Sequence, residues 1–197
     1  SSEDTLVYVP GMISHLEAGL EDSEYLAWIR ELSKSFRLII FDKRGQGLSD
    51  RDSSAPNLEE RMDDISAIVE AENLNQFFLF GLSEGAAISL VYAATHTNKV
   101  KSVAVFGGTA KFTKAFDYKF VPEYKVMVEN MLSSWGSGNS GYYFCPQKMP
   151  EKKGFLAKLE RMVCNPKTLQ SILELLSKID VRTTLPDINL PVLVLHS

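Results

Sequence analysis

The sequence predicts an α/β fold in which helices cover both faces of a mostly parallel sheet. Short apolar runs alternate with helical patterns over the first 110 residues, and the runs do not alternate with polar residues. Continuously apolar strands are typical of a parallel sheet buried on both faces, and strand–helix alternation is typical of βαβ units with right-handed crossovers. Turns follow several of these runs, and we expect them to meet at the carboxyl edge of the sheet, where such folds bind ligands.

Five apolar runs are the predicted strands: residues 5–9, 37–41, 76–80, 103–106 and 191–195. Three helices are predicted between them, at residues 23–36, 57–73 and 86–94. In the first two helices the apolar side chains recur at helical spacing, and Asp22 or Ser23 can cap the first.

Residues 111–190 break this pattern, because they carry no strand signal. Three helical stretches are predicted there instead, at about residues 118–132, 149–163 and 166–179, with a Gly/Ser/aromatic loop at 133–144. A helical insertion between two strands predicts a lid over the binding edge. We therefore divide the chain into a core at 1–110, a helical cap at 111–190 and a returning core strand at 191–197.

Composition excludes several classes of protein. The 197 residues carry a net charge of −4, which leaves no basic footprint for nucleic acid. No apolar run approaches the roughly 20 residues of a membrane span. Cys145 and Cys164 lack metal-ligand spacing, so we expect reduced thiols in a cytoplasmic protein, with no metal and no cofactor.

The pentapeptide Gly81-Leu82-Ser83-Glu84-Gly85 is the most informative motif. It separates the apolar run at 76–80 from the helical run at 86–94. Glycine and serine are common, so the pentapeptide alone is weak. A Gly-x-Ser-x-Gly between strand and helix is a nucleophile elbow, and this context favours a catalytic-type serine over an ordinary tight turn.

Motifs along nearly the whole chain resemble an α/β-hydrolase, and more closely the α/β-hydrolase-like N-terminal domain of certain bacterial adenylate/guanylate cyclases. The residues that carry the closer match are Tyr8-Val9-Pro10-Gly11, Ser14-His15-Leu16-Glu17, the turn 41–50 (FDKRGQGLSD), the helix segment 59–65 (EERMDDI), the elbow 81–85, Ala93-Ala94-Thr95-His96, Trp135-Gly136, Asp180-Val181-Arg182 and Leu193-Val194-Leu195-His196. The Ser-Glu-Gly elbow and the segment 59–65 are the specific parts, because the turn at 41–50 is common to many α/β-hydrolases.

The resemblance implies an α/β-hydrolase fold with two further strands before Thr5 and a last strand and helix after Ser197. It also implies a cyclase domain as a possible partner in the same polypeptide. In this fold the chain order is serine, acid, histidine, with the acid usually following the strand at 191–195. Neither the acid nor the histidine is assignable, so residues 1–197 alone should not be a competent triad hydrolase.

If the missing groups are supplied, the predicted chemistry is acyl transfer. Ser83 attacks the carbonyl carbon of a small-molecule ester or acyl compound. The backbone N–H groups of Glu84 and Met12 are the expected oxyanion donors, and Gly11 lets the second loop approach closely. The carboxylate of Glu84 has two interpretations: it points away and stabilises the helix, or it marks a site tuned for binding with weak or no hydrolysis.

Trp135 and His15 are candidate substrate-binding residues. Trp135 belongs to an aromatic loop that either lines a pocket under the lid or packs within the cap. His15 either lines the binding edge or is structural. His96 is expected to stabilise a helix C-terminus. His196 is expected to pack at the end of the last strand or to lie at the edge of the pocket, in preference to acting as the base.

Charged residues near these motifs are expected to be structural. Asp42 and Arg44 hold the turns together, in preference to forming an anion clamp. Asp180 and Arg182 fix the end of the cap to the core. Arg61 lies at the surface or forms a pair between helices.

Three functions remain open from the sequence. The first is an esterase-like serine hydrolase. The second is a catalytically weak or inactive ligand-binding domain that regulates a cyclase. The third, a pure interaction module, ranks last because a glycine-flanked serine is costly to keep for scaffolding alone.

Overall fold

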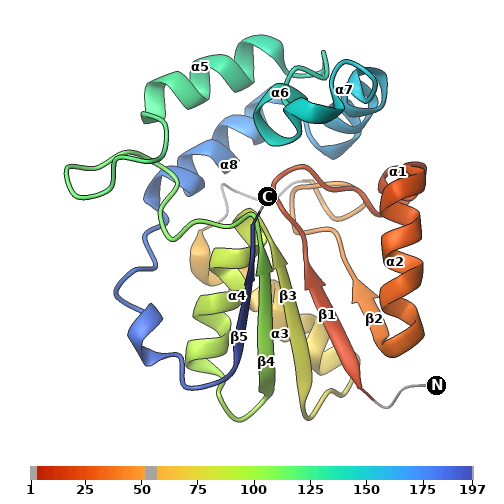
Figure 1. Cartoon of the computed structure of the whole chain (residues 1–197), viewed down its shortest axis with the longest axis vertical. Helices are drawn as coiled ribbons and strands as arrows, with labels where there is room; N and C mark the ends of the chain where they lie inside the picture. Colours follow the sequence, from red (N-terminus) through yellow and green to blue (C-terminus); the bar gives the residue numbers. More distant parts are fainter. Residues whose placement is uncertain (1–3, 52–56, 197) are drawn as a thin grey trace.

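A single parallel sheet organises the chain (Figure 1). The computed structural model describes residues 4–51 and 57–196. The first residue of the predicted core, Ser1, and the last residue of the predicted returning strand, Ser197, lie outside the described residues. The strand order is β2-β1-β3-β4-β5, and all four pairings are parallel. The strands are β1 (Thr5–Val9), β2 (Arg37–Ile40), β3 (Phe77–Leu82), β4 (Val100–Phe106) and β5 (Val192–Leu195). The predicted parallel sheet is confirmed.

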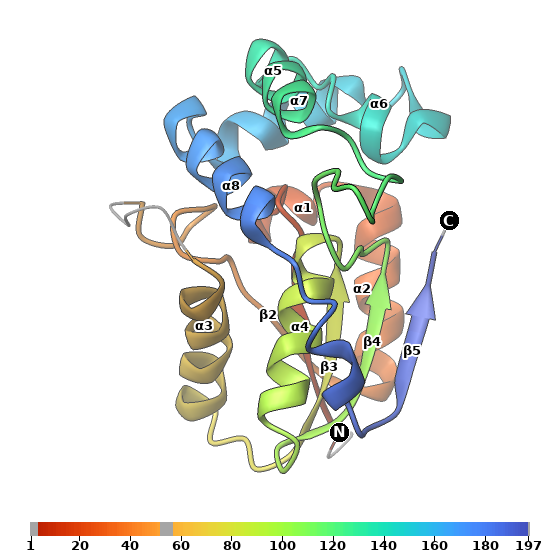
Figure 2. The same cartoon turned by 90° about the vertical axis from the view of Figure 1, so that its left-hand side faces the viewer.

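Helices cover both faces of this sheet (Figures 1 and 2). The core helices are α1 (Leu16–Gly19), α2 (Ser23–Ser35), α3 (Leu58–Ala71) and α4 (Glu84–Thr95). α2 lies on one face, where Trp28 packs against Tyr8 and Phe80. α3 and α4 lie on the other face, where Ile65 and Ile88 are fully buried. The sheet is therefore the middle layer of three.

The starts of the core helices follow from their capping residues. Asp22 accepts hydrogen bonds from the amides of Glu24 and Tyr25 at the start of α2. Asn57 and Glu60 form a reciprocal capping box at the start of α3. These caps satisfy amides that the helix itself leaves without partners.

The cap rises above the carboxyl ends of the strands (Figure 1). Its helices are α5 (Tyr124–Ser134), α6 (Gly141–Phe144), α7 (Lys153–Val163) and α8 (Pro166–Lys178), with 3₁₀ turns at Pro146–Lys148 and Leu185–Asp187. α5 and α7 begin later than predicted, since Pro122 and Pro150 disfavour helical backbone at the residues before them. The one-turn helices α1 and α6 were not predicted from the sequence, since four residues are too few to show a period.

Core and cap join at a short antiparallel contact. Lys111 forms a β-bridge with Asp180, and the amide of Val181 donates to the carbonyl of Ala110 at 2.9 Å. Asp180 also accepts from Lys111 Nζ at 3.2 Å and from Arg182 Nη2 at 2.7 Å. The Arg182 guanidinium holds the pKa of the Asp180 carboxyl below its usual value. The side chains of Asp180 and Arg182 pair with Lys111 and Asp117 inside the predicted cap, and it is the neighbouring Val181 that bonds to Ala110 of the core, so their role in fixing the cap to the core stays a prediction.

A second contact between cap and core is electrostatic. Lysines of the cap meet acidic residues around the N-terminus of α2, in the pairs Lys148–Glu24, Lys152–Asp22 and Lys158–Glu21. Most of these side chains are 44–58% exposed, while Lys152 and Asp22 are mostly covered. This seam of ion pairs closes the edge of the cap that faces α2.

No helix in the described part of the chain is long and apolar enough to cross a membrane.

We expect Gly85→Ala to destabilise the fold and Gly154→Ala to stabilise it. A Cβ on Gly85 would stand 2.2 Å from the carbonyl oxygen of Val9, whereas one on Gly154 would meet nothing within 4 Å. Overpacking against backbone costs about 1–3 kcal/mol, and replacing a helical glycine with alanine gains about 0.5–1 kcal/mol. Urea unfolding followed by circular dichroism measures both. Equal midpoints for the two variants would contradict the close approach of α4 to β1.

Candidate active site

Ser83 occupies a strained turn between β3 and α4. Its backbone angles are φ 52° and ψ −114°, a conformation that side-chain-bearing residues rarely adopt. A Cβ on Gly81 would stand 2.5 Å from the carbonyl oxygen of Gly85, so the chain crosses itself with no room for a side chain. The strand–turn–helix context predicted for the elbow is confirmed.

Two backbone amides flank Ser83 without an acceptor. The loop after β1 comes so close that a Cβ on Gly11 would stand 3.2 Å from Ser83 Cβ. Within residues 4–51 and 57–196, neither the N–H of Met12 nor the N–H of Glu84 donates to a protein group. Both residues line a cavity together with Ser83. The structure therefore brings together the predicted serine, its glycine neighbour and the two expected oxyanion donors.

The cavity above Ser83 is mainly apolar and has a volume of about 380 Å³. Core and cap both contribute to it, and the lining residues are Met12, Ser83, Glu84, Gly107, Thr109, Phe112, Val121, Pro122, Val126, Met127, Asn130, Met131, Tyr143, Phe144, Leu173 and Leu176. The Thr109 hydroxyl forms hydrogen bonds with the Tyr118 hydroxyl and with the carbonyl of Lys111. The side-chain amide of Asn130 has no hydrogen bond within the described residues. The size is within the range of pockets that hold small molecules.

The carboxylate of Glu84 points away from the cavity into a buried cluster of charges. Its Oε2 accepts from Lys43 Nζ at 2.7 Å, and its Oε1 lies 3.5 Å from Arg61 Nε. All three side chains are at most 1% exposed. Despite its burial, Glu84 keeps a lowered pKa because Lys43 and Arg61 favour the charged form. Of the two interpretations of Glu84, the side chain that points away is confirmed.

Of the two positions predicted for Arg61, the pair between helices is confirmed. It is 1% exposed rather than at the surface, and it pairs across helices with Glu84. Its Nη1 donates to the carbonyl of Arg44 at 2.9 Å, and its Nη2 donates to Gln46 Oε1 at 3.2 Å. The arginine thus joins α3, α4 and the turn after β2.

The turn after β2 is held by its own hydrogen bonds. The Asp42 carboxylate accepts from the amides of Leu16 at 3.1 Å and Leu48 at 3.0 Å, and Arg44 Nε donates to Asp64 Oδ1 at 2.6 Å. Asp42 therefore ties two loops together, as predicted, while Arg44 is fixed to α3. Neither residue is arranged as a clamp for an anion.

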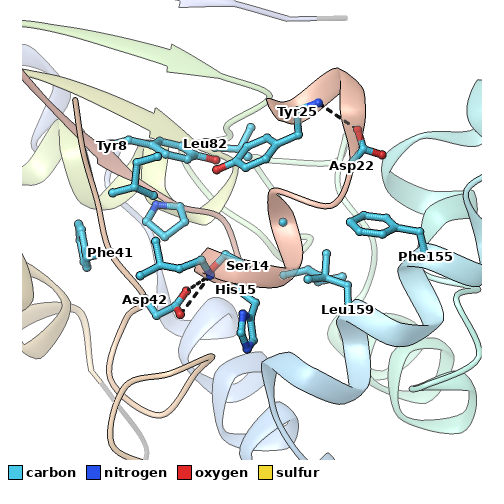
Figure 3. A pocket seen from close by; sticks show the side chains of 15 residues that line it. Tyr8, Ser14, His15, Asp22, Tyr25, Phe41, Asp42, Leu82, Phe155 and Leu159 are labelled. Carbon is cyan, nitrogen blue, oxygen red and sulfur yellow. Dashed lines mark hydrogen bonds between the residues drawn. The ribbon is translucent and has the colours of Figure 1, made fainter. Parts of the chain in front are cut away.

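His15 lies in a second, smaller cavity at the seam between cap and core (Figure 3). This cavity has a volume of about 170 Å³, and Phe155 and Leu159 of α7 close it from the cap. His15 is 5% exposed, and its Nδ1 accepts from the amide of Ala18, so the ring caps α1. Figure 3 shows the hydroxyls of Tyr8 and Tyr25 side by side in the same cavity, where burial raises the pKa of Tyr25 to about 12.

Trp135 is not among the residues that line the cavity above Ser83. Its Nε1 donates to the carbonyl of Cys164 at 2.9 Å, and its ring packs against the core of the cap. His15 and Trp135 are thus not brought to Ser83, and the cap-packing alternative describes the observed contacts of Trp135.

Glu160 organises the loop that carries Trp135, and the sequence analysis missed it. Its buried carboxylate accepts from the amides of Gly136 at 2.6 Å and Gly138 at 2.9 Å, and from the hydroxyl of Ser140. The sequence did contain a signal, because Glu160 stands on the apolar stripe of Leu156, Leu159 and Val163.

Within residues 4–51 and 57–196, no imidazole and no carboxylate hydrogen-bonds the Ser83 hydroxyl. His96 lies at the end of α4 and stacks on Tyr92, with 3.9 Å between the two ring centroids. His196 follows β5. The same residues contain no group of three or more His, Cys, Asp or Glu side chains able to hold a metal ion.

Comparison with known proteins identifies the family. The family model described as serine aminopeptidase, S33, matches residues 1–197. The chain belongs to this family of the α/β-hydrolase superfamily. The five-stranded parallel sheet with its flanking helices is accordingly the α/β-hydrolase fold.

Individual relatives are distant. The chain is 28% identical over 178 residues to the AB hydrolase superfamily protein YisY of Bacillus subtilis, a match that covers 85% of this chain and 66% of YisY. It is 24% identical over 194 residues to the pimeloyl-[acyl-carrier protein] methyl ester esterase of Vibrio atlanticus, covering 90% of this chain and 71% of that protein. The esterase EaEST of Exiguobacterium antarcticum has a similar structure, with a TM-score of 0.78 at 22% identity, covering 98% of this chain and 73% of that chain. The chain thus spans about two thirds of YisY.

We expect Ser83→Gly to be more stable than Ser83→Ala by about 1 kcal/mol, because glycine adopts the observed positive φ without the penalty of a Cβ. Ser89 in the middle of α4 is the matched control, since there glycine should be about 1 kcal/mol less stable than alanine. Chemical unfolding of the four variants measures the two differences. The same sign at both positions would refute the strained turn.

Proposed function

We propose that this chain forms the core of a serine hydrolase that cleaves uncharged esters by acyl transfer to Ser83. One observation supports this above all: a serine with positive φ lines an apolar cavity between two backbone amides that have no acceptor among residues 4–51 and 57–196. Such amides are the usual donors to the oxyanion of acyl transfer. The family membership and the ester-cleaving relatives support the same reaction.

In the proposed reaction, Ser83 Oγ attacks the ester carbonyl carbon and gives its proton to a general base. The N–H groups of Met12 and Glu84 donate to the resulting oxyanion, and the N-terminus of α4 adds the favourable end of a helix dipole. Collapse of the tetrahedral species breaks the bond to the alcohol and leaves an acyl group on Ser83. Water then releases the acid by the same route in reverse.

The base and its acid partner are expected later in the chain. In this fold the acid and the histidine follow the serine in chain order, and the acid usually comes after the strand that corresponds to β5. The described residues contribute the nucleophile, the oxyanion donors and the substrate cavity. Acyl transfer therefore depends on residues beyond His196.

The cavity points to a neutral acyl group. Methionine, valine, leucine and phenylalanine side chains make up most of its lining. Among the described residues the one charged residue in the lining is Glu84, whose carboxylate is turned toward Lys43 and Arg61. The side-chain amide of Asn130, which has no partner among the described residues, can hydrogen-bond one uncharged polar group of the substrate. An apolar wall leaves a charged substrate without the solvation or the partner that it would need.

A catalytically weak binding domain is the second candidate, because no imidazole reaches Ser83 in the described chain. The buried position of Glu84 weighs against this candidate, since its charge is balanced by Lys43 and Arg61 and does not oppose an oxyanion. A cyclase domain in the same polypeptide rests on sequence resemblance and stays a prediction. The cytoplasmic location also stays a prediction, and two free cysteines support it.

We expect a fluorophosphonate probe to label Ser83 in the natural full-length protein. The probe reacts with a serine that has an activated hydroxyl, so digestion and mass spectrometry should find it on the peptide that contains residue 83. Ser83→Ala should abolish labelling, and Ser171→Ala should leave it intact, because Ser171 is a half-buried serine of α8 that does not line the cavity above Ser83. A folded protein without label at Ser83 would reject the hydrolase and leave the binding domain.

We expect Met127→Trp to shorten the acyl chains that the enzyme accepts. Met127 lines the cavity from α5, so an indole there takes up volume that an acyl chain needs. With p-nitrophenyl acetate, butyrate and octanoate, kcat/KM should fall about tenfold or more for octanoate and stay within about twofold for acetate. Met162→Trp is the control, because Met162 does not line this cavity. Equal losses on all three esters would place the acyl chain elsewhere.

A further inference from the structure

The ammonium group of Lys43 lies at the meeting point of three loops beneath Ser83. Lys43 follows β2, its side chain is 1% exposed, and its Nζ donates to Glu84 Oε2 at 2.7 Å, to the carbonyl of Gly11 at 3.0 Å and to the carbonyl of Pro10 at 3.1 Å. An ammonium has three N–H donors, so every one has an acceptor. Nothing in the proposed reaction requires a lysine here, and Lys43 is not among the residues that line the cavity above Ser83.

Two of the three acceptors of Lys43 are connected directly to the expected oxyanion donors. The carbonyl of Gly11 and the N–H of Met12 are the two ends of one peptide group. A trans peptide is planar, so its C=O and N–H point in opposite directions. When Lys43 holds the Gly11 carbonyl, it fixes the direction of the Met12 N–H. By binding the Glu84 side chain, it also holds the first residue of α4, whose N–H is the second donor.

We propose that Lys43 is a positioning residue that aligns the Met12 and Glu84 amides around Ser83. The inference rests on the proposed function, because it assigns these amides to an oxyanion. Charge assistance strengthens the effect, since a cation on the carbonyl end of a peptide polarises the N–H at its other end.

The surrounding network supports this role. Gln46 donates through Nε2 to the carbonyl of Met12 and accepts from Arg61, so both carbonyls that border the Met12 amide are held. Arg61 Nε and Glu84 Oε1 lie 3.5 Å apart without forming a hydrogen bond. Lys43 thus links the loop after β1 to α4 by direct hydrogen bonds.

Lys43 also makes the alignment sensitive to pH. Burial lowers the pKa of Lys43 to about 8, against the opposing attraction of Glu84. The charged groups that act on it are Glu84, Arg61 and Asp64. As the pH rises through about 8, the ammonium loses a proton and with it one of its three donors.

The test measures fluorophosphonate labelling of the natural full-length protein, with the inactivation rate constant separated from the binding constant of the probe. Lys43→Met should lower the rate constant about 10- to 100-fold and leave the binding constant within about twofold, because the donors act on the transition state. The wild type should lose rate as the pH rises through about 8, and Lys43→Met should lack that step. Lys34→Met, at an exposed position of α2, is the control and should behave as the wild type.

A double variant separates positioning from stability. Lys43→Met combined with Glu84→Met replaces a buried ion pair with apolar side chains of similar size, a change that proteins often tolerate. We expect the double variant to recover most of the Tm that Lys43→Met loses, but to label as slowly as the single variant. Recovery of both properties would reduce Lys43 to a structural partner of Glu84, and a wild-type rate in folded Lys43→Met would also overturn the proposal.

A wild type that does not label would reject the proposed function without deciding the alignment. Amide NMR then provides the answer, because the Met12 and Glu84 resonances should shift across pH 8 in the wild type and stay constant in Lys43→Met. Unchanged resonances in both proteins would refute the alignment by Lys43.

Discussion

The rest of the site depends on the close approach of α4 to the sheet. At Gly81 and Gly85 the backbone of the elbow touches the backbone of neighbouring segments, and no Cβ fits at either position. This contact places Ser83 in a conformation with positive φ and directs the first amides of α4 toward the loop after β1. The position of the serine is therefore set by packing of main chain on main chain, which is stiffer than packing between side chains.

Burying Lys43, Arg61 and Glu84 beneath this elbow carries a desolvation cost that apolar side chains would avoid. In return, the charged groups form hydrogen bonds, whose strength depends on direction as well as on distance. Each lysine donor binds an acceptor on a different residue, so displacement of either loop breaks at least one strong hydrogen bond. An apolar contact would hold the loops together but would let them slide.

Much of the fold could be predicted from the sequence, because the signals are local. Apolar runs marked the strands, Asp22 marked the start of α2, and the pentapeptide around Ser83 marked the elbow. The serine, Gly11 and the Met12 and Glu84 amides are all found together in the structure.

The buried charges could not be placed in the same way, because their partners are distant along the chain. Arg61 stands on the apolar stripe of its helix, three residues after Leu58 and four before Ile65, which is a sign of burial. Lys43 sits in a turn, where periodicity carries no information. Its partner Glu84 is 41 residues away, and only the folded sheet brings the two together. Trp135 stayed open between two positions for a related reason, since the sequence of an aromatic loop is the same in a pocket wall and in a packed cap.

The seam of ion pairs between the cap and α2 makes the rim of the molecule responsive to its ionic environment. Exposed pairs such as Lys148–Glu24 and Lys158–Glu21 are screened as salt rises, with a Debye length of about 10 Å at 0.1 M and about 3 Å at 1 M. The main-chain bridge between Lys111 and Asp180 is not weakened in the same way. Rising salt therefore weakens the attraction between cap and core mainly along this seam, which lies next to the small cavity that Phe155 and Leu159 close.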